Sequence, residues 1–75
     1  MTLTPSIHDL FEQLGLENTD NGINGFIERH KGLNDKVKLE NAPFWNPSQA
    51  QFIQRALAED AEWAEIIDQL NARLR

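Results

Sequence analysis

Apolar residues recur every three or four positions along much of the chain, and this spacing predicts amphipathic helices. A first helix is expected to start with Thr4 as its cap and Pro5 as its first helical residue, and to end at the left-handed turn of Gly15. Its buried stripe would consist of Ile7, Leu10, Phe11 and Leu14.

A second helix is predicted from about Asp20 to Lys31, with Asn18 or Thr19 as its cap and Gly32 as its stop. Two Asn-Gly pairs, at 21–22 and 24–25, disfavour this helix, since a helical glycine costs up to about 1 kcal/mol relative to alanine. A turn in the first half of the segment is the competing interpretation. The inward face of the helix would be formed by Ile23, Phe26, Ile27 and His30.

The segment 33–46 lacks a helical period. Residues 36–40 alternate between polar and apolar types, which predicts a short extended stretch. The adjacent aromatic residues Phe44 and Trp45 indicate that part of this long loop packs against the rest of the protein, because long loops in small domains are uncommon unless they pack or function.

A third helix is predicted to begin after Asn46, with Pro47 first and Gln49 completing a capping box. Two apolar stripes follow, offset by about 50° if the helix is continuous. Continuity would place Asp60 in the seam between them, where a carboxylate is costly, so a break with Asp60 capping a fourth helix is favoured. The stripes comprise Ala50, Phe52, Ile53, Ala56 and Leu57, then Trp63, Ile66, Ile67, Leu70 and Leu74.

These patterns predict an all-α fold, a compact bundle of four short helices with a long ordered loop before the third. We expect residues 1–75 to form a single helical domain. A chain of this size buries only about 60% of its unfolded surface, which leaves little material to enclose a deep cavity. No apolar run approaches the roughly 20 residues that a membrane span requires.

Composition excludes several classes of protein. The chain has no cysteine, so it has neither a disulfide framework nor a thiolate metal site. Twelve acidic residues against seven basic ones give a net charge of −5, opposite to what a phosphate-binding surface requires. We expect a protein partner, with a second copy of the chain as one candidate. The composition argues against a membrane and disfavours nucleic acid.

Charged residues are segregated along the chain. Four of the seven basic residues lie within ten positions: Arg29, Lys31, Lys36 and Lys38. Five of the twelve acidic residues lie within another ten: Glu59, Asp60, Glu62, Glu65 and Asp68. Both groups could be ordinary solvated surface. Alternatively they meet, within one chain or across a homodimer, where opposite charges would raise the association rate.

Candidate chemistry is sparse. His8 and Glu12 have helical spacing for two metal ligands, but no third ligand is evident, and an exposed pair is the commoner arrangement. His30 lies on an apolar stripe near a helix C-terminus, which predicts a packed histidine, with a catalytic base as the alternative. The chain has no phosphate-binding loop, nucleophile elbow or zinc-protease motif. We predict no catalytic, cofactor-binding or metal-binding residue.

The large aromatic residues are the remaining candidates. Phe44, Trp45 and Trp63 either all fill the core, or Trp45 or Trp63 stays exposed as an interface anchor, since tryptophan is enriched at binding hot spots. Small domains often gain stability by pairing. The candidate partner-binding residues are therefore Phe44, Trp45, Trp63, Arg29, Lys31, Lys36 and Lys38.

The run Ala-Pro-Phe-Trp-Asn-Pro-Ser-Gln-Ala at 42–50 resembles a group of short bacterial proteins classed only as a conserved domain of unknown function. The resemblance covers nearly the whole chain and extends to residues 10–16, 26–30, 56–60, 63–64 and 68–70. It implies a helical bacterial protein of the cytoplasm, and it carries no activity, cofactor or site residue.

Two classes of function remain. The favoured one is a non-enzymatic protein–protein interaction module that self-associates through the Phe44–Trp45 loop and the opposed charge patches, because no catalytic constellation is visible. The alternative is a small-ligand binder or minor enzyme using His30 and nearby carboxylates. A nucleic-acid-binding accessory role ranks third, because the net negative charge would repel phosphates.

Overall fold

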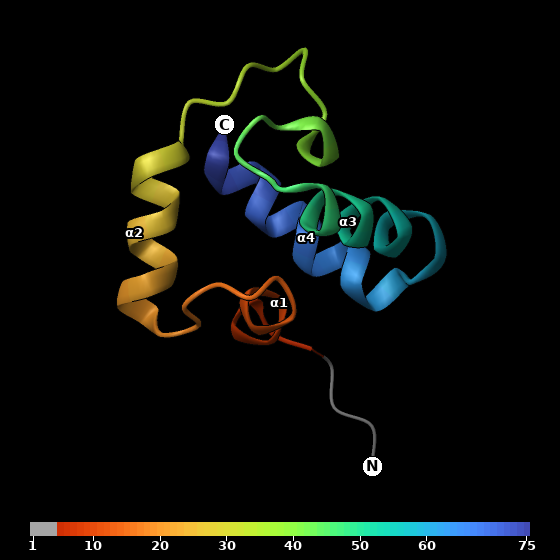
Figure 1. Cartoon of the computed structure of the whole chain (residues 1–75), viewed down its shortest axis with the longest axis horizontal. Helices are drawn as coiled ribbons and strands as arrows, with labels where there is room; N and C mark the ends of the chain where they lie inside the picture. The colour runs from red at the N-terminus through yellow and green to blue at the C-terminus, as the bar shows by residue number, and fades with distance from the viewer. Residues whose placement is uncertain (1–4) are drawn as a thin grey trace.

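The computed structural model describes residues 5–75, and all regular secondary structure in that range is helical, as predicted. The elements are α1 (Ile7–Gln13), α2 (Asp20–His30), the 3-10 turn η1 (Leu39–Asn41), α3 (Pro47–Glu59) and α4 (Ala61–Leu74). Figure 1 shows α3 and α4 side by side, with α1 and α2 on the other flanks of α4, so that α4 contacts each of the other three α-helices. None of the described helices is long and apolar enough to cross a membrane.

Helix α1 begins later than predicted. Ser6 is its N-cap, and a capping box joins Ser6 to Asp9: the Ser6 hydroxyl accepts from the Asp9 N–H at 3.3 Å, and the Asp9 carboxylate accepts from the Ser6 N–H at 2.9 Å. The predicted cap, Thr4, lies outside the described residues, and Pro5 precedes the helix. A capping box needs a side-chain acceptor three residues after the cap. Asp9 provides this acceptor for Ser6, whereas Ile7, three residues after Thr4, has none.

Helix α1 is terminated by a glycine in the left-handed conformation, as predicted. Gly15 has φ +72°, the Leu16 N–H donates to the Phe11 carbonyl at 2.8 Å, and the Gly15 N–H donates to the Glu12 carbonyl at 3.0 Å. This pair of bonds is the Schellman motif, which satisfies the last carbonyl groups of a helix.

Helix α2 runs through both Asn-Gly pairs, so the helical prediction is confirmed and the competing turn is wrong. Thr19 caps it by accepting from the Gly22 N–H at 3.0 Å. The Glu17 side chain packs closely against the backbone of Gly22. A Cβ at this position would come within 2.7 Å of three atoms of that side chain, so only glycine fits without a shift. After the helix, Gly32 adopts φ +92°, as its predicted role as the stop requires.

The predicted extended stretch at 36–40 is wrong. The Asn34 side chain accepts from the Lys36 N–H at 2.9 Å and its carbonyl accepts from the Val37 N–H at 2.9 Å, which makes a turn, and η1 follows at Leu39–Asn41. An isolated extended segment would leave its backbone groups unpaired, since the described residues contain no strand for it to join. The turn satisfies these groups locally while Leu39 enters the core.

The chain breaks at Asp60, as favoured from the sequence. Asp60 ends α3 by donating its N–H to the Ala56 carbonyl at 3.0 Å. Its carboxylate caps α4 by accepting from the N–H groups of Glu62 and Trp63 at 3.1 and 3.3 Å. The predicted capping box of α3 is also confirmed, with Asn46 and Gln49 bonded reciprocally at 2.8 and 2.9 Å.

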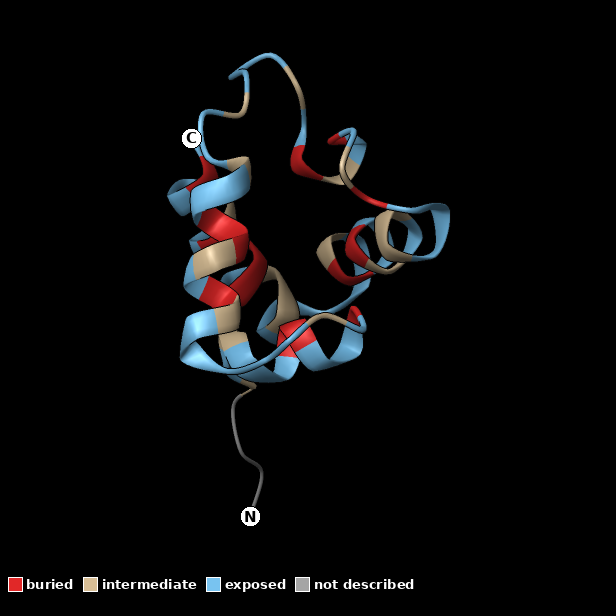
Figure 2. Ribbon diagram, turned by 60° about the vertical axis from the view of Figure 1, so that its left-hand side comes forward, coloured by how far each residue is buried: buried red, intermediate tan, exposed pale blue. Residues whose placement is uncertain are grey.

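The core lies between the facing sides of the helices, where Figure 2 shows the buried residues. Most of the predicted apolar stripe residues are buried, whereas Ile7, Ala50, Phe52, Leu57 and Trp63 are only half-buried. The buried residues are Leu10, Phe11, Leu14, Ile23, Phe26, Ile27, Leu39, Ala42, Trp45, Ile53, Ala56, Ile66, Ile67, Leu70 and Leu74.

The cap at Asp60 gives a first test. Asp60→Ala removes both hydrogen bonds to the start of α4 and should lower the free energy of unfolding by about 1 kcal/mol. Asp68→Ala removes the same charge from an exposed position inside α4 and should change it by less than about 0.5 kcal/mol. Urea denaturation followed by circular dichroism measures both. Equal losses would show that charge, not capping, is what Asp60 contributes.

Candidate functional site

Trp45 belongs to an aromatic cluster that closes the core. Its ring stacks on Phe26 with centroids 5.4 Å apart, it is 8% exposed, and its indole N–H donates to the Leu39 carbonyl at 2.8 Å. Phe44 meets Trp45 edge-on at 4.8 Å and is half-buried. The Phe44–Trp45 loop therefore packs, as its aromatic content indicated, and for Trp45 the core interpretation holds.

His30 is half-buried and packs against two aromatic rings. Its imidazole lies 4.5 Å from the Phe26 ring and 4.4 Å from the Phe44 ring, measured between centroids. Among residues 5–75 no carboxylate forms a hydrogen bond or ion pair with it. This geometry is that of a packed histidine, and the structure does not bring the carboxylates invoked for a catalytic base into contact with the ring.

His8 pairs with a residue that the sequence spacing does not indicate. Its Nε2 lies 2.7 Å from Asp20 Oδ1, which links α1 to the first turn of α2, whereas Glu12 is not its partner. Both side chains are exposed, so the pair contributes little to stability. Within the described part of the chain no three His, Cys, Asp or Glu side chains gather as a metal site would require.

The two charge patches form no ion pair with each other among the described residues. Arg29, Lys31, Lys36 and Lys38 are all exposed, and so are the acidic residues between 59 and 68. In residues 5–75 the close contacts between basic and acidic side chains are His8–Asp20 and Lys31–Glu28, the latter within α2 at 3.0 Å. Lys38 and Asp68 border the same small hollow without forming an ion pair. The patches thus do not neutralise each other within one chain.

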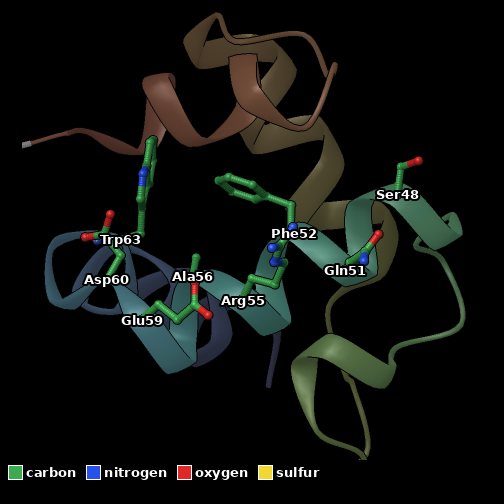
Figure 3. A pocket seen from close by; sticks show the side chains of 8 residues that line it. All are labelled: Ser48, Gln51, Phe52, Arg55, Ala56, Glu59, Asp60 and Trp63. Atoms are coloured by element: carbon green, nitrogen blue, oxygen red, sulfur yellow. The ribbon is translucent and has the colours of Figure 1, made fainter.

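Trp63 lies in a different setting, beside Phe52. The two rings meet edge-on with centroids 5.7 Å apart, and both side chains are half-buried. They line an open groove of about 510 Å³ at the corner where α3 meets α4, which we call the Phe52–Trp63 groove. Figure 3 shows both rings rising on the same side of this corner. The residues that line it are Ser48, Gln51, Phe52, Arg55, Ala56, Glu59, Asp60 and Trp63.

Local hydrogen bonds position the groove. Trp63 stands in the first turn of α4, where its N–H is bound by the Asp60 carboxylate. The start of α3 is tied to α1, because Gln49 donates its side-chain amide to the Leu14 carbonyl at 2.9 Å. Around the two rings the groove has one guanidinium, on Arg55, and two carboxylates, on Glu59 and Asp60.

The chemistry of the groove is that of a binding surface. It offers apolar rings, ionic groups and one hydroxyl, that of Ser48, which lies in the first turn of α3. It has neither an imidazole nor a thiol that could serve as a base or nucleophile. Trp63 is among the site residues predicted from the sequence, whereas Phe52 is not, because its place on the apolar face of its helix is also typical of a core residue.

Residues 1–74 match the family model described as protein of unknown function (DUF2789), which confirms the resemblance to a conserved domain of unknown function. No curated protein and no solved structure matches the chain. The family match carries no activity and no site residue.

The different settings of the two tryptophans give a second test. Trp45→Phe removes a buried indole N–H and leaves the Leu39 carbonyl without its donor, which should lower the free energy of unfolding by about 1–3 kcal/mol. Trp63→Phe keeps a ring beside Phe52 and should cost less than about 1 kcal/mol. Urea denaturation followed by circular dichroism compares them. A larger loss for Trp63→Phe would contradict the burial described above.

Proposed function

The chain belongs to the family of unknown function DUF2789, and we propose that it is a non-enzymatic protein–protein interaction module whose binding surface is the Phe52–Trp63 groove. The observation that carries this proposal is a pair of large aromatic side chains, in mutual contact and only half-buried, at an open surface. Tryptophan side chains that anchor interfaces occupy such positions, since they offer a large contact area at low entropic cost.

The groove favours a partner segment that is apolar and positively charged. Glu59 and Asp60 outnumber Arg55 among the lining residues, and Glu62 and Glu65 extend the negative charge along α4. A lysine or arginine side chain can lay its aliphatic stem on the rings while its cationic group meets a carboxylate. The face of an indole ring attracts such a cation further. An amphipathic helix with a basic face is one segment of this kind.

The proposed binding surface is not the Phe44–Trp45 loop that the sequence predicts, because Trp45 is buried and its indole N–H already donates to the Leu39 carbonyl. No observation favours the alternative site around His30, whose ring packs against Phe26 and Phe44. We also propose, from the resemblance of residues 42–50, that the protein acts in the bacterial cytoplasm.

The proposal can be tested with two model peptides of about 18 residues, one with a leucine face and a lysine face, the other with glutamate replacing lysine. NMR spectra of the labelled protein contain one indole N–H signal for each tryptophan. We expect the lysine peptide to shift the signal of Trp63 and not that of Trp45, whose N–H is buried and bonded. The glutamate peptide should shift neither.

Two variants serve as matched controls. Phe52→Ala removes one wall of the groove and should weaken binding of the lysine peptide about tenfold. Leu57→Ala truncates a half-buried residue of the same helix that borders a different hollow, and it should leave the affinity unchanged. The proposal fails if neither peptide binds, if both bind equally, or if the two variants behave alike.

A further inference from the structure

The turn between α2 and η1 presents an exposed set of charges. Asp35, Lys36 and Lys38 are exposed, and Val37 between the lysines is half-buried. Hydrogen bonds to Asn34 fix the turn. The Asn34 side chain accepts from the Lys36 N–H, and its backbone carbonyl accepts from the Val37 N–H and from the Arg75 guanidinium. In Figure 1 this segment projects at the top of the view, away from the corner of α3 and α4.

The charges of this turn are the inverse of those of the groove. The turn has two cations and one anion, whereas the groove has two anions, Glu59 and Asp60, and one cation, Arg55. In the described part of the chain the ion pairs involve none of these six side chains. The turn also does not line the groove of its own chain. Apart from the Oδ1 atom of Asp60, which caps α4, both sets of charge are therefore available to a second molecule.

We propose that the turn 35–38 of one chain binds in the Phe52–Trp63 groove of a second copy, an inference that rests on the proposed function of the groove. The lysines then lie against Trp63 and face Glu59 and Asp60, while Asp35 faces Arg55. Opposite charges fix the orientation of the turn, and the lysine stems cover the exposed rings.

Every copy carries one turn and one groove, so reciprocal pairing produces a two-fold dimer in which both contacts form. The net charge of −5 on each chain opposes association. Pairing must therefore come from the local match of charges, and reversal of single charges tests it directly.

The test uses sedimentation velocity from about 10 µM to 1 mM protein, a range in which a weak dimer is detectable. We expect the wild-type chain to dimerise as its concentration rises. Lys36→Glu in the turn and Glu59→Lys in the groove should each weaken dimerisation about tenfold, because each places like charges opposite one another. Glu59→Lys reduces the net charge from −5 to −3, so an effect of net charge alone would strengthen pairing instead.

Dimerisation in an equimolar mixture of the two variants is the decisive measurement. In a mixed dimer the two reversed charges, at positions 36 and 59, face each other at one contact, and the original Lys36 faces the original Glu59 at the other. The wild-type affinity should therefore return to within about threefold. Glu12→Lys makes the same charge change at an exposed position of α1, outside both the turn and the groove, and should leave dimerisation unchanged. Circular dichroism confirms that each variant remains folded.

The inference is overturned if the wild-type chain stays monomeric, if the reversals have no effect, or if the mixture does not recover. A monomeric chain whose groove still binds the lysine peptide would remove the second copy as the partner and leave the proposed function intact. A chain that neither pairs nor binds the peptide would remove both.

Discussion

The chain turns sharply at Asp60, between α3 and α4, and this corner determines how the helices pack. One residue ends α3 and caps α4, so the two apolar stripes fold against each other instead of continuing along one helix. Helix α4 then becomes the central element, which α1, α2 and α3 all contact. The same corner leaves Phe52 and Trp63 side by side but incompletely covered, so the feature that organises the core also creates the groove.

The other end of α4 holds the long loop in place. The Leu74 carbonyl accepts hydrogen bonds from the N–H groups of Gly32 and Leu33 at 2.8 Å, and within the loop the Trp45 indole N–H donates to the Leu39 carbonyl. These contacts give the segment between α2 and α3 a defined path and a fixed turn at 35–38. The loop that carries Lys36 and Lys38 is thus held in one conformation by hydrogen bonds to α4 and within the loop itself.

Sequence patterns predicted the helices and the break well, because caps and stripes depend on residues three or four positions apart. Gly15 and Asp60 are examples in which one local signal determines an element boundary. The site was harder to predict, since it depends on contacts between distant segments. The sequence does not show that Trp45 stacks on Phe26 while Trp63 stays half-covered, nor that His8 pairs with Asp20 twelve positions away.

The relative accessibility of the two tryptophans tests most directly whether the Phe52–Trp63 groove is the open surface of the protein. Hydroxyl-radical footprinting read out by mass spectrometry reports oxidation at each indole separately. Trp63 should be oxidised much faster than Trp45 in the folded, dilute protein, and it should become protected when the groove is occupied. Oxidation of Trp45 at the same rate as Trp63, or faster, would contradict the groove as the recognition surface.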